Sequence, residues 1–258
     1  MNTDEPSATE TAAAAQRAPS NLDDAIHSTS AETLLAVVAD PAFTEDLALA
    51  LLKRADIPSG VLERLAKNSN ISKFRKVKLA LVTHPHTPRH ISLPMVRQLY
   101  LFDLMQVALT PAVPADLKIA ADEALVTRLE TISVGEKLSL ARRASARVAA
   151  ALLLDKETRV MQAALENPRL TEASIVKTIM RSDTSAAFVQ AVSRNPKWSL
   201  RQEVRLALLC NNKTPSSFAL EFARSLPRPQ LREILQKSRL PAHVKSAIQS
   251  ELAVKSEK

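Results

Sequence analysis

The chain contains a long internal repeat, in which residues 34–121 and 161–248 align at a constant offset of 127 without a gap. The alignment holds 22 identities in 88 pairs, and many other pairs place an apolar residue opposite an apolar residue, as in Val82 and Leu209 or Val107 and Ile234. Two copies that keep the same apolar positions have to bury them in the same way. The repeat therefore predicts an internal duplication, with two similar halves built from the same succession of elements.

Hydrophobic residues recur at intervals of three and four within each copy, as in Val204, Leu208 and Leu209. That spacing places them on one face of an α-helix, whereas strict alternation of apolar and polar residues between hairpin turns does not occur. The 258 residues include only two glycines, and fifteen prolines separate the apolar segments. The sequence thus predicts an all-α protein of short helices.

A punctuation mark recurs where the helices are expected to end. It consists of Asp, Asn or His, usually with Pro next, and a Thr or Ser a few residues later. We expect each mark to be a tight turn, with Thr87 and Thr214 as N-caps and the following prolines at the first helical position. The marks are 44 residues apart in each copy and begin at Asp40, His84, Asn167 and Asn211.

A period of this length, filled with two or three helices, is typical of HEAT and armadillo solenoids. Residues from about 30 to 254 resemble a HEAT-like α-solenoid, and the turns resemble those of the bacterial leucine-rich repeat variant proteins. The resemblance implies a right-handed α-solenoid of short HEAT-like repeats. Relatives that carry an iron–sulfur cluster have several cysteines, whereas Cys210 is alone in this chain.

The N-terminal stretch is acidic and rich in alanine, with Leu22 and Ile26 as its only large aliphatic residues. It is too polar to form a core and lacks the basic start of a signal peptide, which predicts a disordered tail and a cytoplasmic protein. Thr29 and Glu32 have the spacing of a capping box, so order is expected to begin there. The predicted regions are a tail (1–28), a first solenoid half (29–130), a connecting helical pair (131–160) and a second half (161–254).

Charge divides the chain unevenly. Residues 32–130 hold twelve basic and eleven acidic residues, whereas residues 131–258 hold 22 and eleven. An excess of cations attracts phosphates or an acidic protein surface when the side chains share one face, although such residues can also be spread around a solvated surface. The candidate partner-binding surface comprises Arg194, Lys197, Arg201, Arg205, Lys213, Arg228 and Arg232.

Trp198 is the single tryptophan of the chain and stands where the first copy has Ile71. Such a residue at a turn can be an apolar plug or an exposed anchor for a partner. His84, His86 and His90 have a spacing that could bind zinc, but the second copy has Asn211, Lys213 and Ser217 there, and neither cysteine nor carboxylate stands nearby. Solvated turn residues are the simpler interpretation, and no metal or cofactor is predicted.

Motifs for phosphate loops and for nucleophilic catalysis are absent from the sequence, and no apolar run reaches the length of a membrane span. We therefore expect a non-enzymatic interaction scaffold whose basic C-terminal half binds an acidic protein. The alternative is a HEAT-like protein that binds nucleic acid with the same half. Aromatic residues make up 3% of the chain, which disfavours stacking on single strands but not duplex binding by charge.

Overall fold

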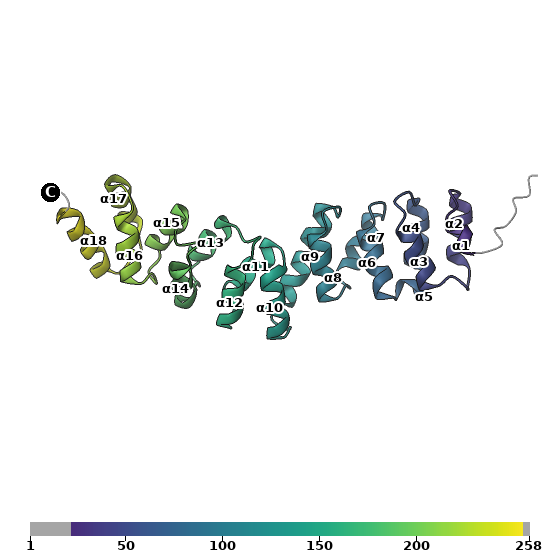
Figure 1. The fold of residues 1–258 in the computed structure, drawn as a ribbon, viewed down its shortest axis with the longest axis horizontal. Coiled ribbons are helices and arrows are strands. Elements are labelled where there is room, and N and C mark those ends of the chain that lie inside the picture. The colour runs from purple at the N-terminus through teal and green to yellow at the C-terminus, as the bar shows by residue number, and fades with distance from the viewer. Residues whose placement is uncertain (1–21, 255–258) are drawn as a thin grey trace, which may run out of the picture. The chain divides into compact units, whose positions relative to one another are not determined.

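The computed structural model describes residues 22–254, with side chains described as far as residue 250. This part of the chain forms eighteen α-helices and no strand (Figure 1), so the predicted all-α class is confirmed. Residues 1–21, which the sequence predicts to be a disordered tail, lie outside the described residues.

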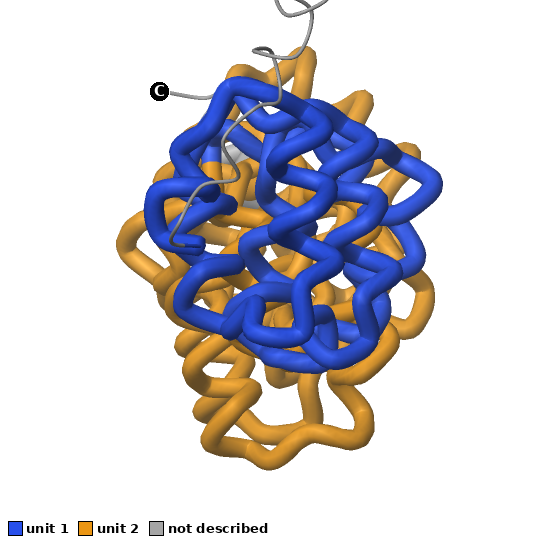
Figure 2. The backbone as a smooth tube through the Cα atoms, turned by 90° about the vertical axis from the view of Figure 1, so that its right-hand side faces the viewer, with its two compact units in different colours: residues 1–99, 111–117 blue, residues 100–110, 118–258 orange. Residues whose placement is uncertain are grey.

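The chain divides into two compact units (Figure 2). The described part of unit 1 is residues 22–99 and 111–117, and that of unit 2 is residues 100–110 and 118–254. The division does not coincide with the boundaries at 130 and 160 that the sequence suggested. Residues 131–160 contain α10 (Val134–Arg143), α11 (Ala146–Leu152) and the start of α12.

In unit 1, helices that are not adjacent in sequence pack side by side: α2 on α4, and α3 on α6. Their apolar faces form one cluster, in which Leu34, Leu51 and Leu62 are fully buried. The helices of unit 1 are α1 (Leu22–Ala25), α2 (Ala31–Ala39), α3 (Glu45–Leu52), α4 (Ser59–Lys67), α5 (Ser69–Ser72), α6 (Arg75–Thr83) and α7 (Arg89–Val96).

In unit 2, helices pack in two rows, α10–α12–α14 and α11–α13–α15–α17, and α16 packs on α18. Helix α9 begins in the segment assigned to unit 1 and continues into unit 2. The remaining helices are α8 (Leu101–Leu109), α9 (Ala115–Arg128), α12 (Thr158–Leu165), α13 (Glu172–Ile179), α14 (Ala186–Arg194), α15 (Gln202–Cys210), α16 (Ser216–Arg224), α17 (Arg228–Lys237) and α18 (Ala242–Val254).

Local sequence explains where many of these helices begin. The hydroxyls of Thr44, Thr171 and Ser185 accept from backbone N–H groups in the first turn of α3, α13 and α14. Each cap satisfies a donor that the helix itself cannot pair. A full capping box forms between Ser133 and Glu136 at the start of α10. Side-chain oxygens thus fix the first residue of helices that are too short to be stable alone.

The start of order predicted at residue 29 is wrong. Helix α1 precedes it, and Ile26 is buried there. The cap of α2 is Ser30 rather than Thr29, because the Ser30 hydroxyl accepts from the Thr33 N–H group. The buried Ile26 adds the short helix α1 to the core ahead of the Ser30 cap. The average composition of the N-terminal stretch does not reveal this single residue.

Candidate functional site

One polar side chain at the end of a helix bridges two backbone groups in several of the turns. Asn211 follows α15, donates from Nδ2 to the Ile179 carbonyl at the end of α13 (2.6 Å), and accepts from the Lys213 N–H group (2.8 Å). Asn167 does the same after α12, with Nδ2 2.7 Å from the Ala141 carbonyl of α10. An amide suits this position because it offers a donor and an acceptor together. The residue therefore holds its own turn and ties it to the neighbouring helix end.

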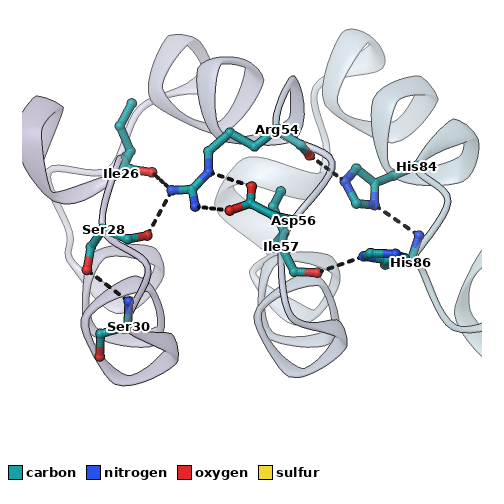
Figure 3. Close-up of polar contacts among 8 residues, drawn as sticks. All are labelled: Ile26, Ser28, Ser30, Arg54, Asp56, Ile57, His84 and His86. Atoms are coloured by element: carbon teal, nitrogen blue, oxygen red, sulfur yellow. Dashed lines mark hydrogen bonds and ion pairs between the residues drawn. The ribbon is translucent and has the colours of Figure 1, made fainter.

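His84 performs this task in unit 1 (Figure 3). Its Nε2 lies 2.8 Å from the Arg54 carbonyl oxygen, which can only accept, so Nε2 carries the hydrogen. Its Nδ1 accepts from the His86 N–H group at 3.2 Å and is therefore unprotonated. Burial lowers the pKa of His84, and the neighbouring His86 lowers it further. The geometry thus requires a neutral imidazole.

The three histidines do not come together as a metal site. His84 is 5% exposed and uses both ring nitrogens, which corrects the expectation that it is a solvated turn residue. His86 and His90 are exposed, and His90 lies 3.8 Å from Glu63. Across residues 22–254, no group of three or more His, Cys, Asp or Glu side chains could hold a metal ion.

Arg54 extends the same connection by one helix (Figure 3). Its guanidinium donates to the Ile26 and Ser28 carbonyls after α1 (2.5 and 2.9 Å) and pairs with Asp56 through two bonds. This pairing lowers the pKa of Asp56 through the hydrogen bond from Arg54. A helix end whose carbonyls would otherwise lack partners is thereby satisfied by a charged donor.

The predicted caps at Thr87 and Thr214 are wrong. The N-caps of α7 and α16 are Pro88 and Pro215, and neither makes a side-chain cap bond. Both threonines are buried and donate instead to a carbonyl six residues earlier, Leu81 (2.7 Å) and Leu208 (2.6 Å). Thr184 donates to the Thr178 carbonyl in the same way. The hydroxyl therefore closes the preceding helix rather than opening the next one.

Trp198 is a buried plug and not an exposed anchor. It is 2% exposed, and its Nε1 donates to the Leu165 carbonyl at the end of α12 (2.9 Å). The Lys197 ammonium covers the ring at 4.2 Å from its centroid. The indole fills the turn after α14 and supplies the bond to the neighbouring helix.

In the turn after α14, Trp198 rather than Asn195 makes the bond to the neighbouring helix end. The Asn195 Oδ1 accepts from the N–H groups of Lys197 and Trp198, but its Nδ2 has no acceptor among the described residues. Asn68, at the same place after α4, uses Nδ2 to bind the Val38 carbonyl at 3.0 Å. The substitution of an indole donor therefore leaves one amide group free beside a groove.

The groove runs between α12 and α14 and has a volume of about 650 Å³. Its lining includes the small side chains of Ala187 and Ala191 and the larger apolar side chains of Met161 and Leu165. Gln162 and Gln190 are exposed along its sides. Glu166, Arg194 and Asn195 line the groove where α12 and α14 end.

The structure separates the seven predicted basic residues into two kinds. Arg205 donates to the Ser199 carbonyl (2.6 Å) and the Ser225 hydroxyl (3.1 Å), and Lys213 donates to the Thr184 carbonyl. These two serve the fold. The side chains of the others are exposed and make no hydrogen bond or ion pair with described residues: Arg194, Lys197, Arg201, Arg228 and Arg232.

Sequence reasoning missed three further features of this surface. Arg169 donates to the Arg143 carbonyl at 3.0 Å and so lies at the end of α10 as well as of α12. Leu200 is 70% exposed between the cations of the turn after α14. Arg142 is exposed in the last turn of α10. Only the recurrence of cations in the last turn of successive helices could have pointed to Arg142, and nothing in the sequence distinguishes Leu200.

Comparison of the chain with protein-family models, with curated proteins and with solved structures found no match. Every helix in the described range is too short or too polar to cross a lipid bilayer. The interpretation of the surface therefore depends on its geometry and charge.

Proposed function

We propose that the chain is an internally duplicated, right-handed α-solenoid of HEAT-like repeats that acts by binding an acidic protein, without catalysis of its own. The positions of the helices support the duplication. Helices α3 and α13, α4 and α14, and α6 and α15 have the same lengths, and their bounds differ by 127 residues. This is the offset at which the sequence repeats.

The turns support the same proposal through their chemistry. His84 and Asn211 stand 127 residues apart, and each binds the carbonyl of a neighbouring helix end. The arginine–aspartate pair at 54 and 56 recurs at 181 and 183, where the Nη2–Oδ2 distance is 2.6 Å. In a solenoid each repeat buries its apolar face only against its neighbours. Helices packed in rows, with a hydrogen bond from each turn to the neighbouring helix end, fit this requirement.

The observation that carries the binding proposal is the set of exposed cations in unit 2 that no acidic group of the described chain neutralises. Arg201 is the N-cap of α15, and Arg228 is the first residue of α17, whose first turn holds no acidic residue. The positive end of a helix dipole favours anions, so cations at these places are unfavourable for the isolated fold. An acidic partner would offset that repulsion.

The test is a salt titration with two probes, a labelled duplex DNA and a labelled acidic protein without nucleic acid. A protein scaffold should retain the acidic protein at moderate salt, because apolar contacts hold the centre of such interfaces. Its binding to DNA should be weak and lost as salt rises. Micromolar or tighter DNA binding near physiological salt, reduced when Arg194, Arg201 and Arg228 are changed to Gln, would refute the proposal in favour of nucleic-acid binding.

A further inference from the structure

We propose that the C-terminal ends of α10, α12 and α14 form a docking edge for an extended acidic polypeptide whose carboxylates are spaced about three residues apart. This inference rests on the proposed function and adds the site and the spacing that it reads. The docking edge is defined by Arg142, Arg169, Arg194, Lys197 and Arg201, with the groove between α12 and α14 beside it.

Hydrogen bonds place these helix ends side by side. Asn167 and Arg169, after α12, donate to carbonyls at the end of α10 (2.7 and 3.0 Å). Trp198, after α14, donates to the Leu165 carbonyl at the end of α12 (2.9 Å). The three ends therefore follow one another in order, each presenting at least one exposed cation.

The spacing follows from helix packing. Axes of packed helices lie about 8–10 Å apart. An extended chain in the polyproline-II conformation advances about 3.1 Å per residue with three residues per turn, so three residues span one interval between helices. Residues three apart then face the same way, and a segment lying across the three ends would bring every third side chain to a new cation.

The groove decides what should lie between the carboxylates. Glu166 stands at its end and would repel an acidic residue placed directly over it. Gln162, Gln190 and the free Nδ2 of Asn195 can pair with the backbone of an extended segment. We expect the bound peptide to place an apolar side chain over the groove, near the exposed Leu200. Its sequence would then repeat an acidic residue, an apolar residue and a spacer.

Helix stability alone does not account for the docking edge. Cations in the last turn of a helix do interact favourably with its dipole, which explains Arg142 and Arg194 in part. Lys197 lies beyond the last turn of α14, and Arg201 is the N-cap of α15, where the dipole of that helix disfavours a cation. The apolar Leu200 between them favours a polypeptide over a nucleic-acid backbone.

The experiment uses the full chain and two labelled peptides of about nine residues with the same composition. In one, Asp-Leu-Ser is repeated, and in the other the aspartates are contiguous. Fluorescence anisotropy should show the spaced peptide binding about tenfold more tightly. Changing Arg142, Arg169 and Arg194 together to Gln should remove that preference. The control changes Lys156, Lys177 and Arg239 to Gln, which removes the same charge; all three are exposed and lie before α12, in the last turn of α13 and after α17.

Four results would overturn the docking edge. Equal affinity for both peptides, or equal losses in both triple variants, would mean that charge acts diffusely, and the proposed function would survive. Absence of binding to either peptide, with the acidic protein still retained, would place the interface elsewhere on the chain. If the chain binds duplex DNA and neither peptide nor acidic protein, the proposed function fails as well. Circular dichroism and the fluorescence of Trp198 establish that each variant is folded.

Discussion

Replacing Asn211 by Ala should destabilise unit 2 far more than the same change at the next residue. Asn211 is 9% exposed, and its removal leaves the Ile179 carbonyl and the Lys213 N–H group without their partners. Each unsatisfied buried group costs about 1–3 kcal/mol, so the free energy of unfolding should fall by about 2–4 kcal/mol, allowing for partial access of water. Asn212 is exposed and makes no bond within the described chain, so Asn212→Ala should change it by less than about 0.5 kcal/mol.

Urea unfolding followed by tryptophan fluorescence measures this difference locally, because Trp198 is the single tryptophan and is buried in unit 2. The midpoint of Asn211→Ala should shift clearly below that of the unmodified chain, while Asn212→Ala should overlay it. Coincident midpoints for the two variants would refute the idea that the buried amide ties α15 to α13.

Asn211→Asp provides a second arm of the same test. A carboxylate can still accept from the Lys213 N–H group, but it cannot donate to the Ile179 carbonyl and adds a negative charge beside it. The ionised form is therefore disfavoured in the folded state, which raises the pKa of the introduced carboxyl. Since the folded state then binds more protons, the deficit of this variant relative to the unmodified chain should shrink as pH falls toward about 4. A deficit independent of pH would argue against a required donor.

The neutral His84 predicts a pH effect of opposite sign in unit 1. Because the folded-state pKa is lowered, the unfolded chain binds the proton more tightly, and stability should be lost as pH falls below about 6.5. His84→Asn, which restores a donor and an acceptor without a titrating group, should flatten this dependence when unfolding is followed by circular dichroism at several pH values. Thr214→Val should cost about 1–3 kcal/mol because it leaves the Leu208 carbonyl without its donor. Thr171→Val, at an exposed cap, should cost about 1 kcal/mol, and thermal unfolding in which Thr214→Val has no effect would contradict this assignment.

Much of the secondary structure could be predicted from the sequence because the helices are short and sharply punctuated. Spacings of three and four mark the buried face of α15, where Val204, Leu208 and Leu209 are fully buried. Pro and Thr after each apolar segment indicate the breaks between helices. The role of each Thr could not be predicted in the same way, because an N-cap and a donor to the preceding helix have the same local sequence and differ only in which backbone group the hydroxyl meets.

The candidate surface was harder to predict, since a charged residue is not assigned to a face by its sequence position alone. Arg205 and Lys213 have the same character as Arg201 in the sequence, yet both turn toward carbonyls of neighbouring elements. The Trp198 Nε1 group makes the bond that would correspond to the one made by Asn68, and this difference depends on a contact across 33 residues. Long-range partners of this kind carry no local signal.

The side chains that tie successive helix ends do so over chain separations that vary. The distance along the sequence between donor and acceptor is 26 residues for Asn167, 28 for Arg54, 30 for Asn68, 32 for Asn211 and 33 for Trp198. The bond fixes where a helix end lies in space, whereas the number of residues between two ends is free within these limits. Insertions or deletions of a few residues between two helix ends joined in this way can therefore be absorbed without moving either end, so the number of residues between helices is a poor guide to the regularity of their packing.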